Sequence, residues 1–187
     1  MRIISGSFKG KKILEPKDIK TRPLKDLTKE SIFNIINHSN KFKINIENSI
    51  ILDLFSGVGS FGIECLSRKA KKVIFVEHYK GVLPILKNNL LSLKSIVNYD
   101  IIEENIHNNL FLKLKYKFDI IFLDPPFKDK NLEEILINIK NSKILNKNGI
   151  IIIHRHKKEH NLFPKNYKII EEKKYGISKI FFFNFKL

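Results

Sequence analysis

Short apolar runs alternate with segments of helical spacing along most of the chain. Runs typical of buried strands cover residues 49–55, 72–77, 99–103, 118–123, 149–153, 167–171 and 179–185. Apolar residues at helical intervals lie between them, over 61–68, 79–93 and 131–141. Strands that alternate with helices predict a mostly parallel, doubly wound α/β sheet. The last two strands have no helix between them, which predicts an antiparallel hairpin at the end of the sheet.

The first 48 residues differ from this pattern. Residues 1–14 contain short strand-like segments, which favour a hairpin, and residues 26–37 have the apolar spacing of a helix. We therefore expect an N-terminal extension over residues 1–48, followed by one α/β domain over residues 49–187.

A glycine-rich turn joins the first predicted strand to its helix, reading Asp53-Leu-Phe-Ser-Gly57-Val-Gly59-Ser-Phe-Gly62, with Glu77 twenty residues after Gly57. This spacing is typical of dinucleotide sites, so a nicotinamide-dependent oxidoreductase is one hypothesis. Asp53 argues against it, because a carboxylate repels the pyrophosphate that a helix N-terminus would bind. The sulfonium and amino groups of S-adenosylmethionine would instead be attracted, and Glu77 could accept hydrogen bonds from its ribose. A tight turn without a ligand is the third interpretation.

A second motif ends the apolar run at 118–123 and consists of Asp124, Pro125, Pro126 and Phe127. Two prolines remove backbone donors, so the carbonyls and the carboxylate form a cluster of acceptors. Such a cluster suits an exocyclic amine, whose nitrogen lone pair could then attack an electrophilic methyl group. Phe127 could stack on the base, a contact worth about 1–3 kcal/mol. The alternative is a rigid turn with a buried phenylalanine.

The large positive net charge is weaker evidence for nucleic-acid binding than its size suggests. The 187 residues carry a formal net charge of +16, from 31 Lys and 4 Arg against 19 acidic residues. Ile, Lys and Asn together fill 82 positions, and their A/T-rich codons can raise the lysine content without a functional reason. The charge favours a polyanionic partner but does not by itself establish nucleic-acid binding.

Other classes of protein are disfavoured. A single cysteine, Cys65, excludes a disulfide framework and a cysteine-rich zinc site. No apolar run approaches 18 residues, so we expect no membrane span and a cytoplasmic protein. The run His154-Arg155-His156 lacks a nearby acidic or cysteine partner, so we expect no metal site.

The two motifs resemble those of class I S-adenosylmethionine-dependent methyltransferases that modify exocyclic amines. The segments Met1-Arg-Ile-Ile-Ser-Gly-Ser-Phe-Lys-Gly-Lys-Lys-Ile-Leu14, Thr21-Arg22-Pro23 and Lys29-Glu30-Ser-Ile-Phe33-Asn34 resemble the N-terminal signature of the RsmD family. These are bacterial methyltransferases that act on guanine N2 of small-subunit ribosomal RNA. The resemblance implies a Rossmann-like class I methyltransferase fold with seven strands in the order 3-2-1-4-5-7-6, the last strand being antiparallel. The implied target is guanine 966 of 16S rRNA.

The resemblance also implies roles for individual residues. Asp124 to Phe127 would bind and activate the guanine amine, with Asp124 acting either as a base or only as an acceptor. S-adenosylmethionine would be held by Asp53, Phe55, Gly57, Gly59, Glu77, His78 and Asn105. RNA would be contacted by Arg2, Lys9, Lys11, Lys12, Arg22, Pro23 and Lys29. Leu24 and Lys29 depart from the family, which usually has Thr and Arg there.

The implied partner is 16S rRNA within the small ribosomal subunit or an assembly intermediate, bound by a monomer without a metal or a membrane. Two alternatives stay open beside the oxidoreductase. One is a methyltransferase of an adenine or cytosine amine in DNA or another RNA. The other is an RNA-binding module without catalytic activity.

Overall fold

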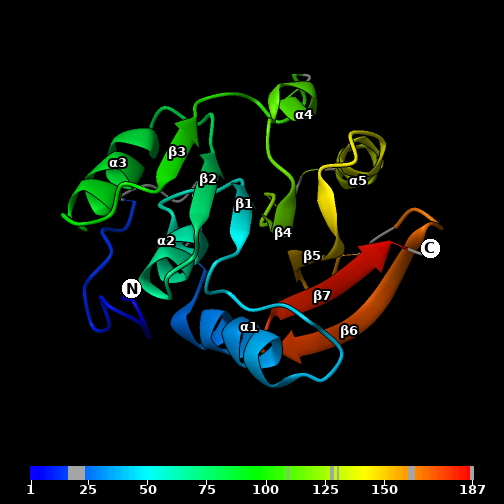
Figure 1. Cartoon of the computed structure of the whole chain (residues 1–187), viewed down its shortest axis with the longest axis horizontal. Helices are drawn as coiled ribbons and strands as arrows, with labels where there is room; N and C mark the ends of the chain where they lie inside the picture. The colour runs from blue at the N-terminus through cyan, green and yellow to red at the C-terminus, as the bar shows by residue number, and fades with distance from the viewer. Residues whose placement is uncertain (17–23, 109, 127–128, 130, 160–162, 186–187) are drawn as a thin grey trace.

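The computed structural model describes residues 1–187 except 17–23, 109, 127–128, 130, 160–162 and 186–187 (Figure 1). Its strands are β1 (Ile50–Leu54), β2 (Lys72–Val76), β3 (Tyr99–Ile102), β4 (Phe118–Leu123), β5 (Leu145–His156), β6 (Tyr167–Tyr175) and β7 (Ser178–Phe185). Its helices are α1 (Asp26–His38), α2 (Ser60–Ser67), α3 (Leu83–Leu91), α4 (Leu110–Lys113) and α5 (Leu132–Asn141).

All of these strands join one sheet in the order β3-β2-β1-β4-β5-β7-β6. The strands from β3 to β5 are parallel, whereas β7 is antiparallel to both β5 and β6. The predicted strand order and terminal hairpin are therefore confirmed. The order reverses between β1 and β4, and ligands in open α/β sheets bind at the carboxyl ends of the strands at such a point.

Successive residues of the central strands face opposite layers. Ile51 and Phe122 belong to an apolar core that contains Phe33 of α1 and Leu86 of α3. Their neighbours along the strands belong to a second core that contains residues of α4 and α5, such as Leu136. Helices on both faces leave the central strands buried, which explains their nearly continuous apolar sequences.

The N-terminal extension packs against the first of these cores through Ile3 and Ile13. The expected hairpin is short: an antiparallel bridge joins Arg2 to Lys12, and the N–H groups of Ile3 and Ile13 donate to the carbonyls of Lys11 and Met1 at 2.9 and 3.1 Å. Residues 5–10 form the turn between the two paired segments, and side chains of α2 supply further hydrogen-bond partners. The backbone N–H groups of Ile4 and Ser5, for example, donate to the Glu64 carboxylate at 2.7 and 2.9 Å.

Helix α3 begins later than its apolar spacing predicts. The N–H groups of His78 and Tyr79 both donate to Oε1 of Glu77 at 2.8 Å, which holds the chain after β2 in a turn. Pro84 lies in the first turn of the helix, where a missing N–H is not costly. Among the described residues, none of the helices is both long and apolar enough to cross a membrane.

Candidate functional site

Three acidic side chains lie where three neighbouring strands end. β1 pairs with β2 and β4, and Leu54 is level with the last residue of each. Asp53 precedes Leu54, while Glu77 and Asp124 are the first residues beyond β2 and β4. The fold thus brings the glycine-rich turn and the Asp-Pro-Pro motif to one edge of the sheet.

Asp53 anchors the glycine-rich turn from beneath. Its side chain is buried, and its Oδ2 accepts the N–H of Gly62 at 2.9 Å. A Cβ at Gly62 would lie 2.9 Å from that oxygen and overlap the Phe75 ring, so only glycine fits. Gly57 and Gly59 have φ of +55° and +86°, a region that side chains disfavour. The turn therefore requires glycine for its conformation as well as for its packing.

The electrostatics at this edge disfavour further negative charge. Burial raises the pKa of Asp53 well above its ordinary value, the Gly62 N–H opposes this rise, and the carboxylates of Asp124 and Glu77 add to it. A pyrophosphate would worsen this repulsion, whereas a cationic ligand would relieve it. The donor and acceptor set thus fits S-adenosylmethionine better than a dinucleotide.

Glu77 connects the second strand to the turn. Its Oε2 accepts the Gly57 N–H at 2.9 Å, and its Oε1 accepts the two N–H groups that open the following turn. These bonds fix the orientation of the carboxylate, and Oε2 keeps acceptor capacity for a hydroxyl group. The arrangement suits a ligand with vicinal hydroxyls, such as a ribose.

Phe55, His78 and Asn105 are the other residues predicted to hold the cofactor. Phe55 follows β1 in the turn and has a φ of +57°, which is unusual for a residue with a side chain and is typical of functional sites. His78 is half exposed, and its Nδ1 lies 3.9 Å from Oε1 of Glu77. Asn105 follows β3, and its Oδ1 accepts the N–H of His107 at 3.1 Å, which shapes the turn there.

A buried hydroxyl at the start of α2 supports a ligand beside the turn. Ser60 is 4% exposed, and its Oγ has no hydrogen-bond partner within the part of the chain that the structure describes. Buried hydroxyl groups are usually paired. An unpaired one next to the glycine-rich turn fits a ligand that would supply the missing partner.

The Asp-Pro-Pro segment is held in a defined orientation. The Asp124 N–H donates to the Leu54 carbonyl at 3.4 Å, and the Pro126 carbonyl accepts the Asp129 N–H at 2.9 Å. The Asp124 side chain is 20% exposed, so its carboxylate can be reached from outside. Phe127, the predicted stacking residue, lies outside the described residues.

Sequence reasoning missed two residues on the neighbouring strand. His154 of β5 makes a 2.8 Å hydrogen bond from Nδ1 to Oδ1 of Asp124 and a 2.9 Å bond from Nε2 to Oγ of Ser178. Arg155 donates to the Pro126 carbonyl at 3.3 Å. The acidic partner that the histidine run lacked in sequence is supplied across the sheet. The only sequence signal for this contact was that His154 follows a predicted strand that would lie beside the strand before Asp124.

The predicted RNA-contacting residues divide into four groups, of which the buried Lys29 is the last. Arg2, Lys9 and Lys12 are exposed. Lys11 is half-buried, donates to the Ser92 carbonyl and lies over the Phe8 ring, so it is partly engaged within the fold. Arg22 and Pro23 lie outside the described residues.

Lys29 requires a correction, because its side chain is fully buried. Its Nζ donates to the Arg2 carbonyl at 2.7 Å and lies 3.8 Å from Oε2 of Glu64. An ammonium in this position cannot reach an RNA phosphate. Lys29 therefore holds the N-terminal extension against α2, and we remove it from the RNA-contacting set.

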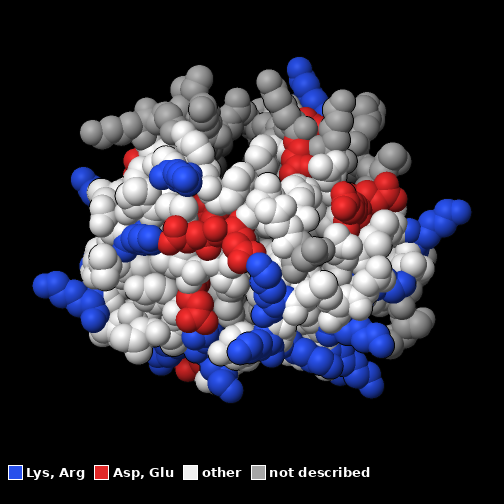
Figure 2. All heavy atoms as spheres, turned by 90° about the horizontal axis from the view of Figure 1, so that it is seen from above, with Lys and Arg blue, Asp and Glu red and all other residues white. Residues whose placement is uncertain are grey.

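Charged side chains are distributed unevenly over the surface. Figure 2 shows the molecule from above the view of Figure 1, with acidic atoms gathered near the middle and Lys or Arg projecting around much of the edge. Although the net charge is +16, basic side chains do not cover this face uniformly.

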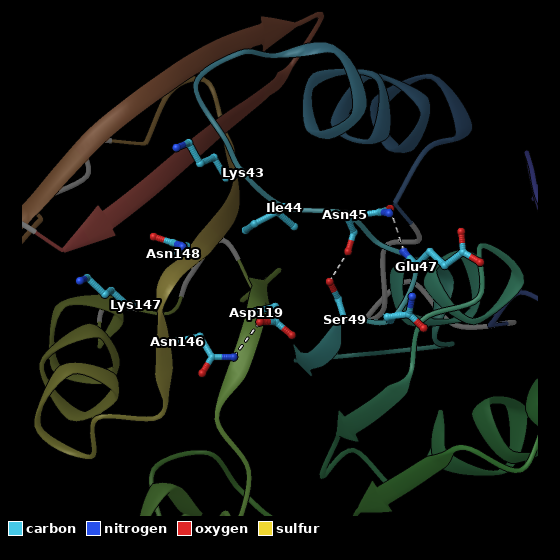
Figure 3. Close-up of a pocket in the computed structure, with 10 residues that line it drawn as sticks. Lys43, Ile44, Asn45, Glu47, Ser49, Asp119, Asn146, Lys147 and Asn148 are labelled. Carbon is cyan, nitrogen blue, oxygen red and sulfur yellow. Dashed lines mark hydrogen bonds between the residues drawn. The ribbon is translucent and has the colours of Figure 1, made fainter.

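A separate cavity of about 440 Å³ lies at the opposite, amino-terminal ends of the strands (Figure 3). Lys43 and Lys147 line it, together with polar groups that bond to one another. Asp119 accepts the Ile50 N–H at 2.8 Å and the Asn146 amide at 2.7 Å. These bonds fasten the starts of three strands, and the cavity is remote from the acidic edge.

Comparisons with known proteins cover nearly the whole chain. The family model described as "Conserved hypothetical protein 95" matches residues 1–184. The Ribosomal RNA small subunit methyltransferase D of Haemophilus influenzae is 35% identical over 181 residues, covering 95% of this chain and 90% of that protein. The protein of the same name from Buchnera aphidicola subsp. Acyrthosiphon pisum is 34% identical over 171 residues, covering 91% and 86%. The solved structure of Escherichia coli yhhF aligns with a TM-score of 0.81 at 28% identity, covering 100% of this chain and 98% of that chain.

Proposed function

The chain belongs to the Conserved hypothetical protein 95 family, the RsmD family, and from that premise we propose that it methylates guanine N2 in small-subunit ribosomal RNA. The family supports the coarser activity, an S-adenosylmethionine-dependent rRNA methyltransferase of class I fold. The choice of the guanine amine, and of guanine 966 within 16S rRNA, is the proposal.

The residues at the acidic edge suit the cofactor. When bound, S-adenosylmethionine supplies a methyl group on a positively charged sulfur. The buried carboxylate of Asp53 and the glycine-rich turn would hold the methionyl side, and Glu77 would bind the ribose. His78 and Asn105 would lie beside the nucleoside, and Phe55 would line the turn.

The observation that carries the choice of an amine is the set of acceptors at Asp124. The Pro126 carbonyl already accepts the Asp129 N–H and the Arg155 guanidinium. The Pro125 carbonyl and Oδ2 of Asp124 have no such partner among the described residues. Two acceptors match the two hydrogens of an exocyclic amine, and holding both leaves the nitrogen lone pair aimed at the methyl group. Methyl transfer would form the nitrogen–carbon bond and break the sulfur–carbon bond of the bound cofactor, and Asp124 or water would take the amine proton.

The test compares methyl transfer to three substrates: small ribosomal subunits, naked rRNA and DNA. Wild-type protein should label N2 of guanine in the small subunit or its assembly intermediate. Asp124→Ala should lower the rate by about 100- to 1,000-fold, since it removes a preorganised acceptor. Its affinity for S-adenosylhomocysteine should be unchanged. Asp119→Asn, at the other end of the same strand, is the matched control and should keep the wild-type rate.

Other results would identify the alternatives. Labelling of DNA alone, or of an adenine or cytosine amine, would replace the guanine proposal within the same fold. Binding of NADH without S-adenosylhomocysteine would indicate an oxidoreductase. Full function in Asp124→Ala would indicate a non-catalytic RNA-binding module.

RNA contact is proposed for the exposed basic residues of the N-terminal extension, with Arg22 and Pro23 carried from the family resemblance. Replacing Arg2, Lys9 and Lys12 together by Gln should weaken rRNA binding and flatten its salt dependence. If each residue contacts one phosphate, the slope of log K against log salt should shrink by about 2. The same change at Lys113, Lys115 and Lys117 is the control, and an equal effect there would contradict the assignment.

A further inference from the structure

A hydrogen-bonded chain of three side chains runs from the Asp-Pro-Pro motif into the sheet. Leu123 at the end of β4 is level with Ile153 of β5, so Asp124 and His154 are the next residues on adjacent strands. His154 is 8% exposed and joins Oδ1 of Asp124 to Oγ of Ser178, with distances of 2.8 and 2.9 Å. The carboxylate of the motif is therefore held by a buried imidazole that is itself held by β7.

We propose that His154 is a positioning residue for methyl transfer, which holds Oδ1 of Asp124 so that Oδ2 faces the target amine. This inference rests on the proposed function of Asp124. A carboxylate on a short side chain can rotate, and each rotation would move its acceptor away from the amine. A donor on one oxygen prevents that rotation, as the partner of a catalytic histidine orients the imidazole in hydrolytic enzymes. The role of Ser178 is to fix the plane of the ring.

The surroundings of His154 define its protonation. Burial lowers the pKa of His154, and the Arg155 guanidinium also lowers it. The charge and the hydrogen bond of the Asp124 carboxylate more than offset both, so that the pKa lies above its usual value. Of the described neighbours, β4 contributes this carboxylate, β5 the Arg155 guanidinium and β7 only the Ser178 hydroxyl. Neutral His154 donates from Nδ1 and accepts from Ser178. Protonated His154 would form an ion pair that draws electron density from Asp124 and weakens it as an acceptor.

Two substitutions separate positioning from packing. His154→Asn places an amide N–H2 near the position of Nδ1 and keeps a donor to Asp124, whereas His154→Leu removes it. His154→Leu should lower kcat by about 10- to 100-fold, the size of effect expected when a reacting group is misplaced. Its KM for S-adenosylmethionine should not change, because His154 lies on the substrate side. His154→Asn should recover most of kcat, and its rate should no longer fall as acid protonates the imidazole.

A measurement without turnover tests the contact itself. The titration of His154, followed by nitrogen-15 NMR on the full chain, should move to lower pH in Asp124→Asn because the charge that stabilises the imidazolium is gone. An unchanged His154 titration would overturn the inference whatever the substrate is.

The outcomes distinguish the two proposals. If wild-type protein methylates guanine and His154→Leu is equally fast, the positioning role is wrong while the proposed function stands. If wild-type protein labels no guanine, the proposed function fails, and the NMR titration still decides whether His154 holds Asp124. Equal losses of kcat in His154→Leu and His154→Asn would also overturn the inference, because they would indicate a packing role.

Discussion

A buried ion pair joins the N-terminal extension to α2, and its removal gives a sharp prediction about stability. Lys29 and Glu64 have fully buried side chains, with Nζ and Oε2 3.8 Å apart. Glu64 also accepts the N–H groups of Ile4 and Ser5 and the Nε–H of Arg68. Burial lowers the pKa of Lys29, while Glu64 and Asp26 raise it in part and Arg68 lowers it a little. Inside the protein, each of these two buried charges is therefore stabilised by the other.

The cost of Glu64→Gln can be worked from these contacts. In the glutamine, an NH2 group must replace one of the two carboxylate oxygens. The replacement is least harmful at the position of Oε2, where the NH2 group faces the Ile4 N–H. That N–H is then unsatisfied, at about 1–3 kcal/mol. Lys29 also loses its buried partner, and breaking such a pair costs about 3–5 kcal/mol. The two effects overlap, so we expect the free energy of unfolding to fall by about 3–5 kcal/mol.

The assay is a double-mutant cycle measured by denaturant unfolding. Lys29→Met combined with Glu64→Gln should recover part of the loss, because the buried ammonium that lost its partner in Glu64→Gln is removed as well. The coupling free energy between the two sites should exceed about 1 kcal/mol.

The pair of Lys69 and Glu47 is the control, with a similar separation of 3.7 Å but exposed side chains. Its coupling should stay below about 0.5 kcal/mol. Equal coupling in the two pairs, or additive single changes at Lys29 and Glu64, would refute the reasoning.

Two further predictions concern the glycine-rich turn and one concerns its support. Gly62→Ala should lower the free energy of unfolding by about 1–3 kcal/mol, because the added Cβ would overlap Phe75 and the Asp53 carboxylate. An unchanged melting temperature in thermal unfolding would contradict this prediction and show that the turn can relax. Asp53→Asn should stabilise the protein at neutral pH. A raised carboxyl pKa means that the folded state binds the proton more tightly, so wild-type stability falls as pH rises from about 4. The same variant should bind S-adenosylmethionine about 10- to 100-fold more weakly by calorimetry, and unchanged affinity would contradict the assigned role of Asp53. Asn89→Ala should destabilise by about 2–3 kcal/mol, because its amide bonds both the Leu14 backbone and the turn, and equal unfolding midpoints would contradict this.

Much of the fold was predictable because its signals are local. The run Phe118–Leu123 followed by Asp-Pro-Pro indicates a buried strand and its end without any knowledge of neighbouring elements. The glycines around Gly57 likewise report a backbone conformation that other residues disfavour. Alternation of strands and helices then indicates a mostly parallel sheet, and the observed strand order is the one that the family resemblance implies.

The errors concern residues whose surroundings come from distant parts of the chain. Residues 1–14 pair only over a short antiparallel stretch around Arg2 and Lys12, because side chains of α2 and α3 accept the next N–H groups, those of Ile4, Ser5 and Leu14. His154 looked isolated in sequence, although Asp124 lies beside it across the sheet. Lys29 looked like an exposed basic residue, because nothing near it in sequence shows that it is buried beside Glu64.

The amino-acid sequence by itself determined the strands and the two motifs at the carboxyl edge, and its resemblance to a known family implied the strand order. Only the tertiary structure decided which charges are exposed and which side chains hold the motif in place. The physical reason is that strand and turn propensities depend on neighbours a few residues away. Burial and ion pairing depend instead on what packs against a side chain, and the electrostatic state of Lys29, Asp53 and His154 is set there.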